Sequence, residues 1–194
     1  MNKTYDVIVI GAGAIGSFVA RNLSKYELNV LLLEKENDVC NVTSMANSAI
    51  VHSGYDPIPN TNKAKFNVLG NKMFDEICKD LDVSFSRIGS LTLAFNDEEV
   101  EILKKLELRA KENNVDVKLL SKEETLSLEP YVNDEVKASL LAKTCGIVDP
   151  FNLVMHAMEN AVDNGVKLHL NEEVIKITKE KVQGVIKNNK YGIG

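Results

Sequence analysis

Cysteine is scarce in this chain, and its three cysteines follow no recognisable spacing. Cys40, Cys78 and Cys145 lie far apart and include no C-x-x-C pair. An odd number of widely spaced cysteines argues against a disulfide framework and against a zinc site. We therefore expect reduced, buried thiols and no bound metal.

Long apolar runs and clustered positive charge are missing as well. No segment approaches the roughly 20 apolar residues that cross a bilayer, and residues 1–6 lead directly into an apolar strand without the features of a signal peptide. The chain carries 23 Lys and Arg against 28 Asp and Glu, a net charge of −5, with no arginine-rich run. We therefore expect no transmembrane segment, no nucleic-acid partner and a cytoplasmic location.

The most informative segment is the start of the chain. An apolar run at residues 7–10 leads straight into a G-x-G-x-x-G pattern formed by Gly11, Gly13 and Gly16. The pattern is weak alone, but between a strand and a helix it indicates dinucleotide binding. The first glycine permits a tight turn, the second leaves room for a pyrophosphate, and the third lets the helix lie close to the strand.

Backbone donors and one carboxylate complete this expected site. The N–H groups of Ala14 and Ile15, at the N-terminus of the helix, are expected to face the phosphates. Glu34 follows Gly16 by eighteen positions and ends the second expected strand, where a carboxylate accepts hydrogen bonds from a ribose diol. Such a carboxylate disfavours NADP, whose 2′-phosphate it would repel, but it leaves NAD and FAD open.

Apolar periodicity predicts an α/β fold of the Rossmann type with an inserted α+β segment. The first two strands are continuous apolar runs, which are typical of a parallel sheet covered on both sides. Short strands and a charged helix follow, and then the pattern of apolar runs typical of a parallel sheet returns. The expected domain bounds are residues 1–82 for the first part of the dinucleotide-binding domain, 83–145 for a substrate-domain segment, and 146–194 for the return to the first domain.

The same patterns predict the individual elements. Helices are expected over residues 14–26, 62–81 and 97–113, from a start at 121–124, and from Pro150 to an Asn164-Gly165 stop. Strands are expected over residues 5–10, 29–34, 83–85, 89–95, 117–120, 136–142 and 166–170, and residues 174–177 and 182–186 are interpreted as a hairpin. The apolar side chains that share one face of the first helix are Ile15, Phe18, Val19 and Leu23.

A polar stretch interrupts the periodicity at residues 37–62. Asn, Ser, Thr, Gly and Pro dominate it, so we expect a long loop with a short helix inside it. Ordered loops of this length are usually functional.

The glycine pattern, Glu34-Lys35 and the loop VTSMANSAIVHSGYDP at residues 42–57 together resemble the FAD-dependent oxidoreductases of the D-amino-acid-oxidase-like superfamily. Within it, the chain is most similar to the branch of L-2-hydroxyglutarate dehydrogenases and flavin-linked glycerol-3-phosphate dehydrogenases. The loop departs from the family at Ala49, where glycine is usual. The residues that match the family's loop and next helix are Thr43, Ser44, Asn47, Ser48, Ile50, Val51, His52, Gly54, Lys63, Ala64, Lys65, Phe66 and Gly70. Further matches are Ile88-Gly89-Ser90-Leu91 and Gly146-Ile147-Val148-Asp149-Pro150.

FAD is the cofactor that this resemblance implies. Thr43, Ser44, Asn47 and Ser48 would hydrogen-bond its pyrophosphate and isoalloxazine, and without the resemblance they are equally well explained as turn formers. His52 would lie beside the flavin, either as part of its environment or as a general base. The full cofactor-binding set is Gly11, Gly13, Ala14, Ile15, Gly16, Glu34, Lys35, Thr43, Ser44, Asn47, Ser48, His52 and Val174.

Some members of this set, and some residues outside it, have a plain alternative. Val174 resembles a family position that flanks the adenine, and an ordinary strand valine is an equal interpretation. His156 and His169 are expected to be structural. Three lysines have two interpretations: they form a solvated face, or they provide a positive potential for an anionic substrate. These are Lys63, Lys65 and Lys72.

Family members are typically about twice this length, so we expect the front part of a longer protein, and whether this chain is itself an enzyme stays open. The leading hypothesis is an FAD-dependent oxidoreductase that oxidises a small anionic hydroxy acid or glycerol 3-phosphate by hydride transfer to flavin N5. One alternative is a truncated, non-catalytic FAD-binding fragment that depends on a missing C-terminal half. The other is an NAD-dependent dehydrogenase.

Overall fold

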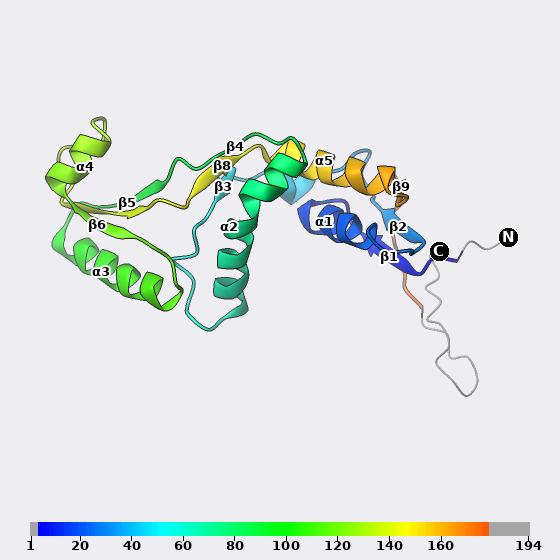
Figure 1. The fold of residues 1–194 in the computed structure, drawn as a ribbon, viewed down its shortest axis with the longest axis horizontal. Coiled ribbons are helices and arrows are strands. Elements are labelled where there is room, and N and C mark those ends of the chain that lie inside the picture. The colour runs from blue at the N-terminus through cyan, green and yellow to red at the C-terminus, as the bar shows by residue number, and fades with distance from the viewer. Residues whose placement is uncertain (1–3, 179–194) are drawn as a thin grey trace. The chain divides into compact units, whose positions relative to one another are not determined.

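The computed structural model describes residues 4–178 (Figure 1). The chain forms two compact units. The first unit consists of Met1–Asn47 and Pro150–Gly194, and the second of Ser48–Asp149. The chain therefore leaves the first unit after residue 47 and returns to it at residue 150.

A three-stranded parallel sheet forms the centre of the first unit. Its order is β1 (Val7–Ile10), β2 (Val30–Leu33) and β9 (Lys167–His169), and Val9 on β1 lies opposite Leu32 on β2. All four residues of β2 are buried, as expected for the central strand of a covered parallel sheet. The strand–helix–strand unit predicted from the sequence is therefore present, and β9 adds the predicted third strand.

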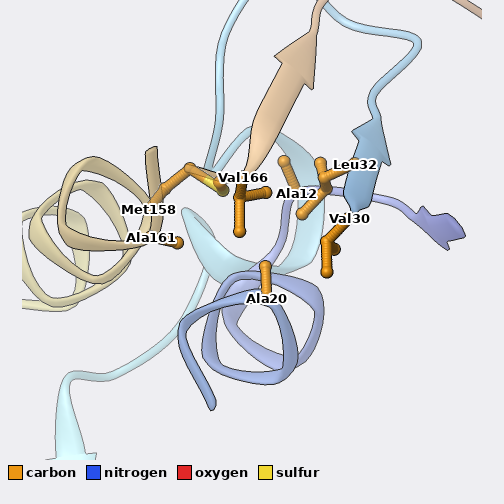
Figure 2. Packing of buried hydrophobic residues seen from close by; sticks show 7 residues of the cluster. All are labelled: Ala12, Ala20, Val30, Leu32, Met158, Ala161 and Val166. Carbon is orange, nitrogen blue, oxygen red and sulfur yellow. The ribbon is translucent and has the colours of Figure 1, made fainter. Parts of the chain in front are cut away.

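Two helices complete the core of the first unit (Figure 2). The helices α1 (Ala14–Leu23) and α5 (Pro150–Asp163) pack against each other, and Arg21 Nε donates to Asn160 Oδ1 at 3.1 Å between them. Their buried side chains join those of the sheet in one apolar cluster. Its buried members are Ala12, Ala20, Val30, Leu32, Met158, Ala161 and Val166.

The helix α5 begins and ends where the sequence predicts. Pro150 is its first residue, a position at which the missing N–H costs no helical hydrogen bond. At the other end, the Gly165 N–H donates to the Val162 carbonyl at 2.9 Å, and the Val166 N–H donates to the Ala161 carbonyl at 3.0 Å. These two bonds form a Schellman cap, which ends the helix.

The buried face of α1 differs from the expectation. Ile15 is 84% exposed and Val19 is 43% exposed, whereas Ser17 and Ala20 are buried. The cause is the close approach of α1 to the preceding turn at Gly16, because only small side chains fit beneath a helix that lies so near its neighbour.

A short antiparallel sheet lies in the second unit. In it, β8 (Gly146–Val148) pairs with β3 (Ile50–Val51) on one side and with β4 (Phe85–Ser86) on the other. The helix α2 (Asn62–Asp80) lies between β3 and β4 in the chain. Neither α2 nor any other helix within residues 4–178 is long and apolar enough to cross a membrane.

A second antiparallel sheet in this unit holds β7 (Ala138–Ala142) between β5 (Ser90–Ala94) and β6 (Lys118–Ser121). The helix α3 (Asp97–Glu112) packs on this sheet, and α4 (Lys122–Leu128) follows β6. A capping box at Ser121 starts α4. The buried residues of this core are Ala94, Leu103, Ala138 and Leu140.

This mixed α/β architecture confirms the predicted fold class, and η1 (Val42–Ser44) is the short helix predicted inside the polar loop. Residues 48–82 lie in the second unit, and their assignment to the FAD-binding domain stays a prediction. Residues 174–177 form no strand. Their expected hairpin partner, residues 182–186, lies outside the described residues.

Candidate functional site

Three glycines shape the turn between β1 and α1, residues 11–16, which we call the glycine turn. Gly11 has a φ of 96°, a left-handed conformation that residues with side chains rarely adopt. A Cβ on Gly16 would stand 1.9 Å from the Gly11 carbonyl oxygen, and a Cβ on Gly13 would stand 3.0 Å from Ser44 Oγ. The turn therefore requires glycine for its conformation at Gly11 and for close packing at Gly16.

The Glu34 carboxylate points into the glycine turn. Its Oε2 accepts a hydrogen bond from the Ala12 N–H at 2.6 Å, and its Oε1 accepts one from the Glu36 N–H at 3.0 Å. The Glu34 N–H donates to the His169 carbonyl on β9 at 2.9 Å. Because a carboxylate has about four lone-pair sites, the two backbone donors orient it and leave acceptor capacity for the hydroxyls of a ribose.

Ser44 closes the other side of the glycine turn. The short helix η1 brings Ser44 Oγ to the N-terminus of α1, where it accepts a hydrogen bond from the Ala14 N–H at 2.9 Å. Asn47 Nδ2 donates to the Ser44 carbonyl at 2.7 Å. The Cys40 N–H donates to the Ala12 carbonyl at 3.0 Å, so the polar loop is tied to the turn at two points.

The same loop contains backbone strain. Val42 has a φ of 75°, which is a steric outlier for a β-branched residue. Such conformations persist only where the surroundings hold them, and they cluster at ligand sites. Since Val42 directly precedes Thr43 and Ser44, the strain is consistent with a loop shaped for binding.

The glycine turn, Glu34 and the polar loop line a cavity of about 370 Å³ in the first unit. This volume is in the range of small-molecule sites, and the positive end of the α1 dipole favours an anion there. The expected cofactor-binding residues in its wall are Gly11, Gly13, Glu34, Lys35, Thr43, Ser44 and Val174. The adenosine diphosphate part of FAD therefore fits the donors and acceptors of this cavity.

Four lining residues are not expected from the sequence. They are Ile10, Asn41, Val42 and Glu173. Ile10, Val42 and Glu173 each adjoin an expected residue, and Asn41 adjoins Val42, so nearness in the chain is the only sequence signal that could have found them.

Other expected residues stand outside the wall of the cavity. Ala14 contributes its N–H to Ser44, Gly16 provides close packing, and the Ile15 side chain is exposed. Ser48 and His52 belong to the second unit, and their contacts with a cofactor stay predictions.

Three lysines for which the sequence offers two interpretations lie exposed on α2. The lysines are Lys63, Lys65 and Lys72, and their role toward a substrate stays open. Within residues 4–178, no three His, Cys, Asp or Glu side chains are arranged to hold a metal ion. All three cysteines are buried thiols that form no disulfide within residues 4–178, and burial raises the pKa of the Cys78 thiol.

Known sequences match nearly the whole chain. The chain matches the family described as FAD dependent oxidoreductase (DAO) over residues 6–193. A glycerol 3-phosphate dehydrogenase of Caloramator mitchellensis is 52% identical over 177 residues, which cover 91% of this chain and 37% of that protein. A mitochondrial L-2-hydroxyglutarate dehydrogenase of Dictyostelium discoideum is 36% identical over 149 residues, which cover 75% of this chain and 33% of that protein.

Solved structures give the same result. Dithionite-reduced L-α-glycerophosphate oxidase from Mycoplasma pneumoniae, with FAD bound, matches with a TM-score of 0.88 and 37% identity over 92% of this chain and 48% of that one. Glycine oxidase from Geobacillus kaustophilus matches with a TM-score of 0.85 at 21% identity, over 91% of this chain and 49% of that one, and shows the fold alone. The chain thus spans about half the length of these proteins or less.

Proposed function

The chain belongs to the DAO family of FAD-dependent oxidoreductases, and from this we propose that its first unit binds the adenosine diphosphate part of FAD. The observation that carries the proposal is the Glu34 carboxylate, held 2.6 Å from the Ala12 N–H beside the N-terminus of α1. A ribose acceptor and phosphate donors thereby lie next to each other.

Each expected residue has a role in this proposal. The N–H groups of Gly13 and Ile15 donate to the pyrophosphate, and the Ala14 N–H, which donates to Ser44 Oγ at 2.9 Å, holds that hydroxyl beside it. No cationic side chain is needed because the helix terminus supplies the positive potential. Glu34 accepts from the ribose diol, with Lys35 beside it. Val174 flanks the adenine.

The polar loop supplies the remaining contacts. We propose that Thr43, Ser44, Asn47 and Ser48 hydrogen-bond the pyrophosphate and the isoalloxazine, as the resemblance of this loop to the family implies. In the same proposal, residues 1–82 and 146–194 serve FAD, and residues 83–145 serve the substrate.

The proposed reaction is oxidation of a small anionic hydroxy compound. Bound flavin supplies a hydride acceptor at N5. A ring nitrogen of His52 accepts the proton from the substrate hydroxyl, while the chain orients both partners and excludes water. Relatives named for glycerol 3-phosphate and L-2-hydroxyglutarate support this substrate class, and three reduced cysteines support the cytoplasm as the location.

A second proposal is a fragment that binds FAD without turnover. It is favoured by the coverage of relatives, since the chain matches only 33% to 48% of the dehydrogenases and the glycerophosphate oxidase. Both proposals require FAD binding, and they differ in whether this chain alone reduces the flavin.

One experiment separates these proposals and the NAD-dependent alternative. The purified chain is titrated with FAD and, separately, with NADH, and binding is followed by the fluorescence of the flavin or of the reduced nicotinamide. FAD uptake with visible flavin absorption is expected. Anaerobic addition of glycerol 3-phosphate or L-2-hydroxyglutarate bleaches that absorption if the chain is an enzyme and leaves it unchanged if it is a fragment. Uptake of NADH without uptake of FAD would overturn the cofactor proposal.

A further inference from the structure

One buried amide of α2 holds the backbone at His52. Asn71 is 5% exposed, and its Nδ2 donates to the His52 carbonyl at 3.0 Å and to the Thr144 carbonyl at 2.9 Å. Buried polar groups are almost always hydrogen-bonded, and leaving one without a partner is costly. The His52 side chain itself is exposed, so its backbone, rather than its ring, is the part that Asn71 restrains.

Arg87 determines which end of the Asn71 amide faces His52. Its Nη1 donates to Asn71 Oδ1 at 3.1 Å, and its Nη2 donates to the Asn71 carbonyl at 2.8 Å. Nη1 also donates to the Thr144 carbonyl. The guanidinium is held in turn by Asp75, whose Oδ2 accepts from Nε at 2.8 Å, and it stacks 5.1 Å from the centre of the Phe85 ring. With a donor fixed on Oδ1, only Nδ2 is left to face the His52 carbonyl.

The loop after His52 is restrained by a separate amide. Asn113 Nδ2, at the end of α3, donates to the Gly54 carbonyl at 3.1 Å and to the Pro57 carbonyl at 2.8 Å. Arg109 Nη1 donates to the Asp56 carbonyl at 2.7 Å. Two asparagines thus make the same kind of contact with one loop, but only Asn71 acts on His52.

We propose that Asn71 is a positioning residue for His52, and that Arg87 orients the Asn71 amide for this role. The proposal rests on the proposed function, in which His52 lies beside the flavin. A histidine next to a flavin must keep a fixed orientation, because small displacements of an interacting group weaken its contribution to binding and reaction.

The matched variants are Asn71→Asp and Asn113→Asp. Each replaces an amide donor between two carbonyls with a carboxylate oxygen, and each adds one negative charge. The two sites differ in that Asn71 is buried beside Arg87, whereas Asn113 is half-buried. We expect Asn71→Asp to weaken FAD binding about tenfold, in keeping with the loss of a net hydrogen bond, and to shift the visible bands of the bound flavin. It also moves the amide NMR signals of His52 and Ser53. Asn113→Asp is expected to lower thermal stability without these flavin effects.

The outcomes are distinct. An unchanged flavin spectrum and FAD affinity in Asn71→Asp would overturn the proposal, as would equal effects from Asn113→Asp. Failure of the unsubstituted chain to take up FAD would overturn the proposed function instead. The His52 amide signals would still show whether Asn71 restrains the backbone at His52 through its hydrogen bond.

A second variant covers the case in which Asn71→Asp does not fold. Arg87→Lys keeps the positive charge opposite Asp75 but cannot reach two acceptors with a fixed fork. We expect it to shift the flavin bands in the same direction by a smaller amount. A folded Arg87→Lys variant with wild-type flavin bands would contradict the role given to Arg87.

Discussion

The Glu34 carboxylate accepts a hydrogen bond from the Ala12 N–H at 2.6 Å, although 22 positions separate the two residues in the chain. This bond places a charged acceptor beside the N–H groups that begin α1. Acceptor and donors form one preorganised surface, on which a ribose and a pyrophosphate are recognised together.

Replacement of Glu34 by Gln tests the acceptor. We expect Glu34→Gln to weaken FAD binding about 10- to 100-fold, because hydrogen bonds to a charged group contribute about 1.5–3 kcal/mol. Titration of FAD fluorescence measures the change. Glu159→Gln is the control, since Glu159 is an exposed glutamate of α5 outside the wall of the cavity. Equal weakening by both variants would contradict the assignment.

Alanine is expected to have opposite effects on stability at two helical glycines, Gly16 on α1 and Gly70 on α2. Gly16→Ala places a Cβ 1.9 Å from the Gly11 carbonyl oxygen, so we expect the free energy of unfolding to fall by at least about 2 kcal/mol. Gly70 on α2 has open space around the added Cβ, and Gly70→Ala is expected to raise the free energy of unfolding by about 0.5–1 kcal/mol. Urea denaturation measures both, and a stable Gly16→Ala chain would show that the close approach is not required.

Replacement of Ser44 by Ala is expected to change the affinity for FAD without a large change in the free energy of unfolding. Ser44→Ala removes the acceptor of the Ala14 N–H and a hydroxyl expected at the pyrophosphate. We expect FAD binding to weaken about 3- to 10-fold, as for the loss of one neutral hydrogen bond. Calorimetric titration measures the affinity. Ser24→Ala, at the end of α1, is the control and should bind FAD as the unsubstituted chain does.

The Asp75 carboxylate is expected to make a pH-dependent contribution to the free energy of unfolding. Its hydrogen bond from Arg87 lowers the pKa of the carboxyl below its ordinary value of 3.8. The contribution is therefore fully present above the unfolded pKa and is lost as pH falls through the lower folded pKa. Urea denaturation of the chain and of Asp75→Asn should differ most near neutral pH and converge in acid. A difference that grows in acid would contradict this sign.

Local patterns were sufficient to predict the glycine turn. Gly11 and Gly16 are required by the geometry of the turn itself, and Glu34 follows from the fixed length of a helix and a strand. The Ser44 hydrogen bond to Ala14 joins residues 30 positions apart. It depends on the path of the loop, which no period or spacing specifies.

The limits of periodicity are clearest at α1 and α2. Ile15 is apolar and on the expected face, yet it is exposed because Gly16 draws the helix against the turn. Asn71 is polar and buried on a helix whose apolar Phe66 is 62% exposed. Its burial follows from two carbonyls and a guanidinium that meet in three dimensions, which hydrophobic patterning does not encode.

The central claim is that the N–H groups at the start of α1 hold the diphosphate while Glu34 holds the adjoining ribose. The most direct measurement is an amide NMR titration of the chain with ADP, which carries only this part of the cofactor. The account predicts that the largest shifts fall on Gly13, Ala14 and Ile15, and that Glu34→Gln weakens the same response. No response to ADP, or shifts centred on residues 48–149, would contradict it.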